Sequence, residues 1–277
     1  MHRWHKGVSD RKRETGTKAI RKPRHVFMVL AYGESPFLAG CVHSLLTQTR
    51  PSNILVATST PNAHVNQIAQ SCRLTVLTNP ARTGIAADWN FALDQAKTYD
   101  LVTLAHQDDV YRPMFLEQTL EAFARGGGAL CFTGYQEIDD AGRSKSSKIS
   151  KVKHLAEALC LGGAREVRGL RLRAFLSLCN PLACSSVTFD LTRLREFRFT
   201  EGFASNLDWD AWWRMMIAGE TFLRAPERLV ARRHNHLTAT AGLIADGTRA
   251  REDLVMFRRA WPWPLGEAVA RLYRLGY

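Results

Sequence analysis

Two adjacent carboxylates, Asp108 and Asp109, directly follow the apolar run Leu101–Ala105 and precede a helix expected after Pro113. In open α/β sheets, ligands bind beyond the carboxyl ends of the strands. Neighbouring acids raise each other's pKa unless they are solvated, paired or bound to a cation. Mg²⁺ and Mn²⁺ prefer carboxylate oxygens and bind through one or two such side chains plus substrate phosphates. The pair therefore predicts a divalent-metal site, or alternatively an acidic helix start stabilised by the helix dipole.

The elements that must position this pair form an alternating β/α pattern from His25 to Tyr135, which is typical of βαβ units and a mostly parallel sheet. We expect strands at His25–Ala31, Ile54–Thr58, Leu74–Thr78, Leu101–Ala105 and Ala129–Thr133. Apolar spacing predicts helices over 38–46, 62–71 and 86–97, and a fourth after Pro113. The polar stretch Asp139–Lys153 is expected to be a mobile loop, and helices dominate after it, two of them beyond Thr248.

The positive charge is concentrated at the start of the chain. Residues 1–24 carry nine Lys or Arg and two acids, more than half of the net charge of +12. We expect a disordered basic tail there, with attraction to a membrane surface as the alternative. The basic segment Arg165–Phe175 is expected to be a helix face in water, or a phosphate or membrane contact. The helices around Trp261–Arg274 are expected to pack on the core, or to lie on a membrane.

Six cysteines lie mostly in apolar runs without metal-ligand spacing, and no apolar run approaches the ~18 residues of a membrane span. These features predict a cytoplasmic protein, with the inner face of a membrane as the further option. The body of the chain lacks aromatic-interleaved basic patches, so no specific nucleic-acid partner is expected.

Two segments carry a family resemblance: Thr83–Leu93, which reads TGIAADWNFAL, and Leu104–Tyr111, which reads LAHQDDVY. They resemble family two glycosyltransferases of the bacterial surface-glycan type. The resemblance implies a GT-A fold, that is, a Rossmann-like mixed, mostly parallel sheet flanked by helices, here with a helical C-terminal extension. It also implies a nucleotide-diphosphate sugar donor and a bound Mg²⁺ or Mn²⁺. Asp109 would hold the metal, and Asp108 the ribose or the metal.

The same resemblance divides the chain into a donor-binding half at 25–140, an acceptor-binding and catalytic-base half at 141–247, and C-terminal helices at 248–277 on the body or a membrane. It implies donor contacts at Ala31, Tyr32, Glu34, Gly84 and Asp88. The usual nucleobase-binding acid is missing from the strand end VATST, so Thr58 or Ser59 is expected to serve instead, and the nucleotide stays open. His106 is either a metal ligand or a structural residue.

In the second half, the segment NLDWDAWWR at Asn206–Arg214 resembles the part of these enzymes that carries the catalytic base. Leu207 stands where an acid is usual, which leaves Asp208 as the expected base, although helix capping would also account for this residue. Ser185, Ser186 and Trp209 are expected beside the acceptor. Arg233, with His234 or His236, is expected to approach the metal or the diphosphate.

These inferences predict an inverting, metal-dependent transfer of a sugar to a glycan or lipid-linked acceptor in cell-surface polysaccharide synthesis. Three alternatives stay open. A nucleotidyltransferase is disfavoured because no Gly-rich basic loop follows the first strand. A non-catalytic nucleic-acid-binding protein is suggested only by the basic tail. An inactive transferase would explain Leu207 and the missing nucleobase acid.

Overall fold

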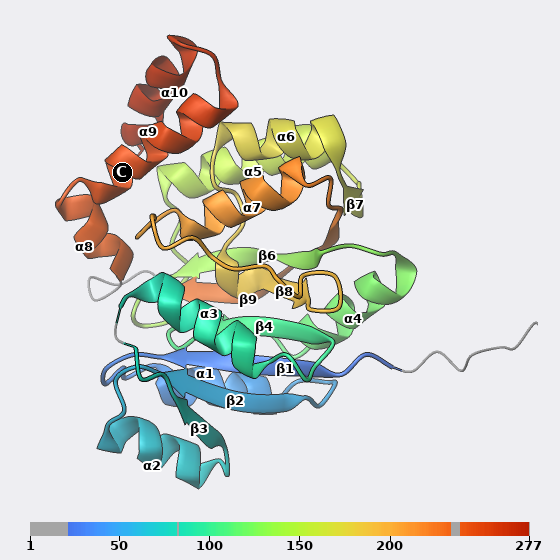
Figure 1. Ribbon diagram of the computed structural model, residues 1–277, viewed down its shortest axis with the longest axis vertical. Helices are drawn as coiled ribbons and strands as arrows, with labels where there is room; N and C mark the ends of the chain where they lie inside the picture. Colours follow the sequence, from blue (N-terminus) through green and yellow to red (C-terminus); the bar gives the residue numbers. More distant parts are fainter. Residues whose placement is uncertain (1–21, 82, 234–238, 277) are drawn as a thin grey trace, which may run out of the picture.

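The computed structural model describes residues 22–81, 83–233 and 239–276, and these form one sheet with helices on both faces (Figure 1). Nine strands belong to this sheet: β1 His25–Ala31, β2 Asn53–Thr58, β3 Thr75–Thr78, β4 Leu101–His106, β5 Val110–Tyr111, β6 Leu130–Ile138, β7 Glu166–Val167, β8 Val187–Asp190 and β9 Phe222–Arg233. The α/β fold expected from the sequence is confirmed.

The strand order is β3-β2-β1-β4-β8-β6-β9-β5, with β7 also paired to β9. β1 runs parallel to both β2 and β4, and β2 runs parallel to β3, as the βαβ pattern predicts. β8 then lies antiparallel between β4 and β6, and β9 runs parallel to β6. Strands from the second half of the chain therefore complete the sheet that the first half begins.

The central strand β1 is apolar from Val26 to Ala31 because both of its faces are covered. Val26 and Met28 face one core, which α3, α5, α6, α7, α9 and α10 complete. Phe27 and Val29 face the other core, which α1, α2 and α4 complete. This alternation follows from the two-residue period of a strand.

The described helices longer than one turn are α1 Leu38–Leu46, α2 Ala63–Ser71, α3 Ile85–Gln95, α4 Phe115–Arg125, α5 Lys148–Leu161, α6 Gly169–Leu178, α7 Leu207–Ile217, α8 Ala239–Ala245, α9 Thr248–Ala260 and α10 Leu265–Arg274. Figure 1 shows α5, α6 and α7 over the β6 and β8 side of the sheet, with α9 and α10 beyond them. No helix among the described residues has the length and apolar character needed to cross a bilayer.

The expected loop at 139–153 is only partly correct, because α5 begins inside it at Lys148. A reciprocal cap starts this helix: Ser147 Oγ accepts from the Ser150 N–H at 3.0 Å, and Ser150 Oγ accepts from the Ser147 N–H at 3.2 Å. The serines that suggested a loop therefore start a helix.

Of the expected basic tail, residues 1–21 lie outside the described part. Arg24 N–H already bonds the Asp100 carboxylate at 2.7 Å.

Candidate active site

The acid pair lies in the turn between β4 and β5, at the carboxyl end of the central strands. His106, Asp108 and Asp109 each offer a ligand atom, and these atoms lie within 4.8 Å of one another. The Asp109 N–H bonds the His106 carbonyl at 3.1 Å, which closes the turn. One nitrogen and two carboxylate oxygens thus converge at the place where an α/β sheet binds its ligands.

Asp109 is only 2% exposed, and this environment penalises its charge. Burial raises the pKa of Asp109 to about 7, and the adjacent Asp108 adds to the shift. Ser185, Arg232 and the Arg233 N–H, which donates to Asp109 Oδ1 at 2.9 Å, oppose it. A cation bound between the two carboxylates would remove the repulsion that raises this pKa.

His106 completes a donor set that suits a divalent metal. Burial lowers the pKa of His106, which favours the neutral ring that a metal requires. Its ring packs at 5.3 Å from that of Trp89, and among the described residues its buried Nε2 atom has no hydrogen-bond partner. An unpaired buried nitrogen beside two acids fits Mn²⁺ or Mg²⁺ coordination, so the residues present are compatible with the metal that the sequence implies.

Asp208 lies in the first turn of α7 and approaches the same centre from the second half of the chain. Its Oδ1 atom accepts hydrogen bonds from Asn180 Nδ2 at 2.9 Å and from the Trp209 N–H at 2.8 Å. Burial raises the pKa of Asp208, while Arg249, Lys153 and Arg232 draw it back down. Asp208 also raises the pKa of His106, which places its charge near the metal-ligand cluster.

The two arginines at the end of β9 have opposite orientations because strand side chains alternate. Arg233 was expected to bind the donor, but its guanidinium donates to the backbone carbonyls of Asp108, Asp139 and Asp140 at 3.1, 2.6 and 2.9 Å. It also lies 4.1 Å from the centre of the Phe37 ring. The Arg233 side chain therefore holds these loops together, and its expected contact with the donor stays a prediction.

Arg232 is an arginine whose charge acts on the acids, and the sequence reasoning missed this role. Its charge affects the pKa of His106, Asp109 and Asp208 in the same direction, by lowering each one. Lys153 of α5 adds a second positive group, and burial together with Arg232 and Arg249 lowers the pKa of Lys153 to about 8. The alternation of the run RLVARR at 228–233 was the signal that could have identified Arg232, had β9 been predicted.

The loop after β1 lies beside the acid turn, as the donor-binding expectation requires. Gln107 bonds both the N–H and the carbonyl of Tyr32, at 3.0 and 2.9 Å, and the Tyr32 side chain is 65% exposed. Gly33, at φ +60°, donates its N–H to Thr60 Oγ1 at 2.7 Å. Ala31 is buried at the end of β1 and Glu34 is exposed in the loop. Donor contacts by these residues stay predictions.

The expected nucleobase hydroxyls are used inside the protein. Ser59 Oγ donates to Asp88 Oδ2 at 2.9 Å, and Asn79 Nδ2 donates to Asp88 Oδ1 at 2.8 Å. Thr58 Oγ1 accepts from the Thr60 N–H at 3.0 Å. Thr58 and Ser59 are each 2% exposed. Their expected contact with a base stays a prediction. Asp88 links the ends of β2 and β3 to α3.

Two of the three expected acceptor contacts point into the core. Trp209 is fully buried, donates its indole N–H to the Leu176 carbonyl at 2.9 Å and packs edge-on against Phe257, so it cannot contact an acceptor. Ser186 is also fully buried and donates to the Ala183 carbonyl at 2.8 Å. Ser185 is 1% exposed and lies beside Asp109 rather than an acceptor surface. His234 and His236 lie outside the described residues.

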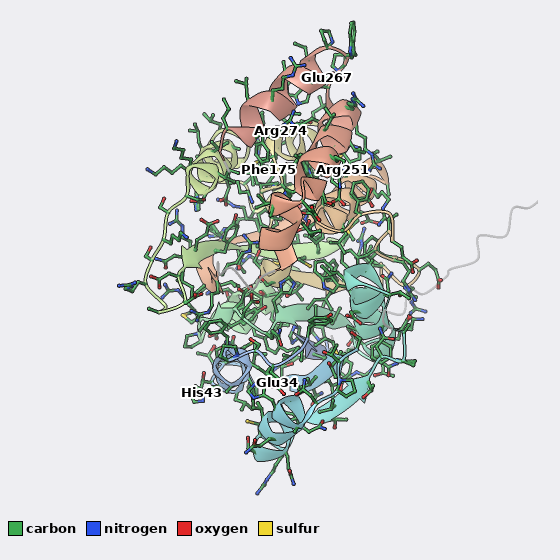
Figure 2. All side chains as sticks on the ribbon, turned by 90° about the vertical axis from the view of Figure 1, so that its left-hand side faces the viewer. Glu34, His43, Phe175, Arg251, Glu267 and Arg274 are labelled. Atoms are coloured by element: carbon green, nitrogen blue, oxygen red, sulfur yellow. The ribbon has the colours of Figure 1, made fainter. Side chains whose placement is uncertain are left out.

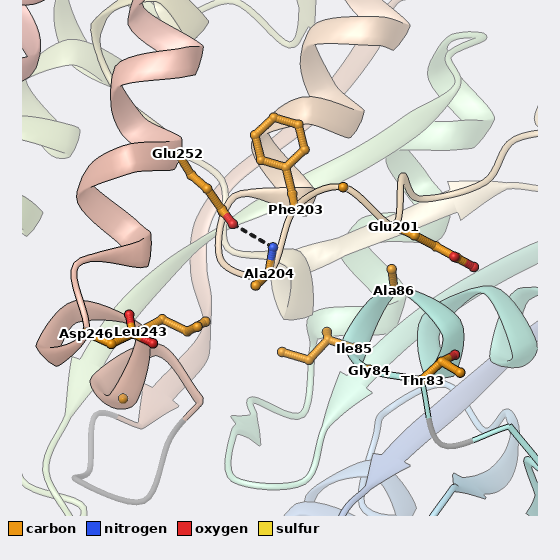
Figure 3. Close-up of a pocket in the computed structure, with 12 residues that line it drawn as sticks. Thr83, Gly84, Ile85, Ala86, Glu201, Phe203, Ala204, Leu243, Asp246 and Glu252 are labelled. Atoms are coloured by element: carbon orange, nitrogen blue, oxygen red, sulfur yellow. Dashed lines mark hydrogen bonds between the residues drawn. The ribbon is translucent and has the colours of Figure 1, made fainter.

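A pocket of about 550 Å³ lies between the start of α3 and the C-terminal helices (Figure 3). Gly84, whose φ of +118° favours glycine, begins α3 at one side of it. The other lining residues are Thr83, Ile85, Ala86, Glu201, Gly202, Phe203, Ala204, Gly242, Leu243, Asp246 and Glu252. Three carboxylates and several apolar side chains line it, and no Lys or Arg is among its described lining residues.

The lining residues 201–204 of the pocket precede α7, the helix of Asp208, and hydrogen bonds from α9 fix this segment. The Glu252 carboxylate accepts the N–H groups of Ala204, Ser205 and Asn206 at 2.7, 2.8 and 2.7 Å. The Asn206 amide in turn donates to Asp253 at 2.7 Å. An acid from the C-terminal helices thus caps α7 from outside, a role that neither motif nor local spacing indicated.

Three solved structures illustrate the likeness of the fold. S. aureus TarS (residues 1–349) is 15% identical, with a TM-score of 0.62 over 84% of this chain and 64% of its own. The mannosyltransferase PcManGT from Pyrobaculum calidifontis, in complex with GDP-Man and Mn²⁺, is 16% identical, with a TM-score of 0.63 over 92% and 70% of the two chains. Glucosyl-3-phosphoglycerate synthase from Mycobacterium tuberculosis, in complex with Mn²⁺ and UDP-glucose, is 15% identical, with a TM-score of 0.56 over 87% and 81%.

The chain thus spans less than two thirds of the TarS structure, and at these identities the likeness establishes the GT-A fold alone. No curated protein matches the sequence. The family model described as glycosyl transferase family 2 matches residues 27–177, more than half of the chain. The chain therefore belongs to glycosyl transferase family 2.

Proposed function

We propose that this chain transfers a sugar, with inversion, from a nucleotide-diphosphate sugar to a hydroxyl group of a glycan or lipid-linked acceptor. The observation that carries the proposal is the approach of Asp208 to the cluster of His106, Asp108 and Asp109. Inverting transfer needs a base at the attacking hydroxyl and positive charge at the departing diphosphate. These two groups come from opposite halves of the chain and lie at one end of the sheet.

Asp109, Asp108 and His106 would hold the divalent cation. Such a cation supplies charge neutralisation for the diphosphate and fixes its position. The donor set of two carboxylates and one imidazole favours Mn²⁺ or Mg²⁺. The Mn²⁺ in the PcManGT complex supports this assignment without fixing the ion for this chain.

Asp208 is the base in this proposal. Both of its hydrogen bonds reach Oδ1, so we assign removal of the hydroxyl proton to Oδ2. The bond from Asn180 fixes the orientation of the carboxylate. Its raised pKa makes the carboxylate a stronger base than an exposed aspartate.

Arg232, rather than Arg233, serves the leaving diphosphate in this proposal. Its charge acts on both the metal ligands and Asp208, and Lys153 adds a second cation to the same region. A diphosphate that departs towards two cations and a metal gains charge stabilisation as its own negative charge develops.

The acceptor sugar is assigned to the pocket between α3 and α9. Its wall runs through residues 201–204 into Asn206, directly before Leu207 and Asp208. Carboxylates bond sugar hydroxyls, and Phe203 offers an aromatic side chain for a sugar ring. We place the reaction in the cytoplasm, where free thiols such as the six in this chain persist, and in the synthesis of a surface polysaccharide.

The test combines ligand binding with turnover. We expect thermal unfolding to shift upward with one nucleoside diphosphate in the presence of Mn²⁺, because a ligand that binds only the native state stabilises it. Asp208→Asn should abolish transfer and retain that shift. Glu121→Gln, at an exposed acid of α4 outside the proposed site, is the control and should retain turnover.

The released product separates this reaction from its rival. A nucleoside diphosphate supports glycosyl transfer, whereas pyrophosphate released from a nucleoside triphosphate would establish nucleotidyl transfer instead. Turnover that survives in Asp208→Asn, or nucleotide binding that is lost in it, would refute the assignment of the base.

A further inference from the structure

The large exposed apolar side chains are concentrated on one part of the molecule. Among the described residues, nine of fifteen lie on α5, α6 and α10 or at the ends of α10. They form what we call the apolar face: Val152, Leu155, Leu159, Leu170, Leu178, Trp263, Leu265, Leu272 and Leu275. Leu170 is 86% exposed, and Leu159 and Leu275 are each 75% exposed. Exposed apolar side chains gathered on neighbouring helices mark an interaction surface.

Contacts at both ends of α10 hold the three helices together. The Trp261 indole N–H donates to the Ser177 carbonyl of α6 at 2.8 Å. Gly276 lies so close to Ile149 of α5 that a Cβ atom there would meet Ile149 Cγ1 at 2.6 Å. Figure 2 shows Glu267 and Arg274 at the end of the molecule opposite Glu34 and His43. The apolar face therefore lies away from the β1–β3 end of the sheet.

The same three helices carry an excess of exposed positive charge. Seven exposed cations lie on them or at their starts: Lys148, Lys151, Arg168, Arg171, Arg173, Arg271 and Arg274. The acids on α5, α6 and α10 are Glu157 and Glu267, and each is paired with an arginine outside these helices, at 2.8 and 2.9 Å. Leucines interspersed with Lys and Arg, and with no unpaired acid on these helices, complement an anionic lipid surface.

We propose that the apolar face docks this protein on an anionic lipid bilayer, with its leucines in the interfacial layer and its cations among the headgroups. Association with a second copy is disfavoured because a twofold contact would bring two sets of seven cations together. The sequence suggested membrane contact for Arg165–Phe175 and for Trp261–Arg274 separately. The structure adds the exposed apolar residues of α5, a helix that begins inside the segment expected to be a loop, and joins all three helices into one face.

The test measures sedimentation of the full chain with vesicles of phosphatidylcholine alone and of an equal mixture with phosphatidylglycerol. No donor is added, so the result does not depend on the proposed transferase activity. Two double variants, Leu155→Ser with Leu159→Ser and Leu272→Ser with Leu275→Ser, remove exposed leucines. Leu46→Ser, at a 50% exposed leucine of α1, is the matched control.

We expect the wild type to bind the anionic vesicles in a salt-sensitive way, each double variant to bind at least about tenfold more weakly, and Leu46→Ser to be unchanged. Thermal unfolding verifies that the variants fold. If the leucine variants are unstable, Arg271→Gln with Arg274→Gln decides the question in the same assay.

Three results would overturn the proposal. The first is a wild type that does not bind anionic vesicles. The second is equal binding by wild type and all variants, which would assign the binding to the basic residues 1–24. The third is a molar mass in light scattering that is lower for the leucine variants than for the wild type, while vesicle binding is the same. That result would identify the face as a contact between copies.

Discussion

Replacement of Asp109 by Asn should stabilise the metal-free protein while it abolishes transfer. Asn has the shape of Asp, and its side-chain oxygen can still accept the 2.9 Å bond from the Arg233 N–H. What it removes is a buried negative charge that lies beside Asp108. Most substitutions at buried positions destabilise a fold. An increase in the free energy of unfolding would therefore be strong support for this account.

The magnitude follows from the pKa of Asp109, which burial and Asp108 raise from 3.8 to about 7. In the unfolded chain this carboxyl loses its proton near pH 4, whereas in the folded protein it keeps the proton until about pH 7. Its contribution to stability therefore falls as the pH rises through this window and is constant above it. About three pKa units correspond to about 4 kcal/mol, which is the gain in unfolding free energy expected for Asp109→Asn at pH 8.

The assay is urea unfolding of wild type and variant in EDTA at several pH values between about 5 and 8. The difference in unfolding free energy should increase with pH up to about 7 and then level off. Addition of Mn²⁺ at pH 8 should stabilise the wild type and leave the variant unchanged, since only the wild type retains both carboxylate ligands. Activity with Mn²⁺ should be lost in the variant.

Asp210 provides a matched control. Its side chain is as buried as that of Asp109, but its neighbours are positively charged and lower its pKa. Burial alone would raise the pKa of Asp210, but bonds from Arg259, Arg214 and Thr200, at 2.5, 2.8 and 2.9 Å, lower it below its usual value. Asp210→Asn should therefore destabilise the protein at neutral pH. A destabilising or pH-independent effect of Asp109→Asn would refute the account of the acid cluster.

Glu252→Gln should lower the unfolding free energy by about 2 kcal/mol, because three charge-assisted bonds to the loop before α7 are weakened. It should also reduce kcat more than it changes donor affinity; an unchanged kcat would show that the clamp does not position Asp208. Arg232→Met should raise KM for the donor, whereas Arg233→Met should lower the unfolding free energy by about 2–4 kcal/mol by leaving three backbone carbonyls unpaired. Urea unfolding and steady-state kinetics distinguish the two arginines, and the reverse pattern would exchange their roles.

The first half of the fold was predictable because each element carries its own local signal. β1 to β4 are short β-rich runs between turn residues, and their observed bounds differ from the expected ones by at most one residue. The acid pair at the end of β4 followed from the same pattern. Fold and family were therefore predicted correctly from this half.

The second half was less predictable because its structure depends on distant contacts. β9 contains Arg224, Arg228, Arg232 and Arg233, which conceal a strand in the sequence. Arg224 is buried there because Glu157 of α5 neutralises it at 2.8 Å. Without β9, the alternation that separates Arg232 from Arg233 could not be deduced.

Trp209 shows the limit of a motif. Its place beside the expected base suggested a contact with substrate, but the burial of an aromatic residue next to a catalytic one depends on the helices packed over it. Phe257 and Tyr273, at ring distances of 5.2 and 6.5 Å, come from α9 and α10. No local pattern around Trp209 reveals these partners.

The strand order has a consequence for synthesis of the chain on the ribosome. β4 and β5 are consecutive in sequence, yet β8, β6 and β9 lie between them in the sheet. Asp109, in the turn that connects them, is fixed by the Arg233 N–H, and the loop before Asp208 is fixed by Glu252. When only the first half of a nascent chain has left the ribosome, Asp108 and Asp109 are present. The contacts from β9 and α9 that fix the site are still missing. The geometry of the candidate site therefore forms late in translation, when α9 has emerged and the sheet can close.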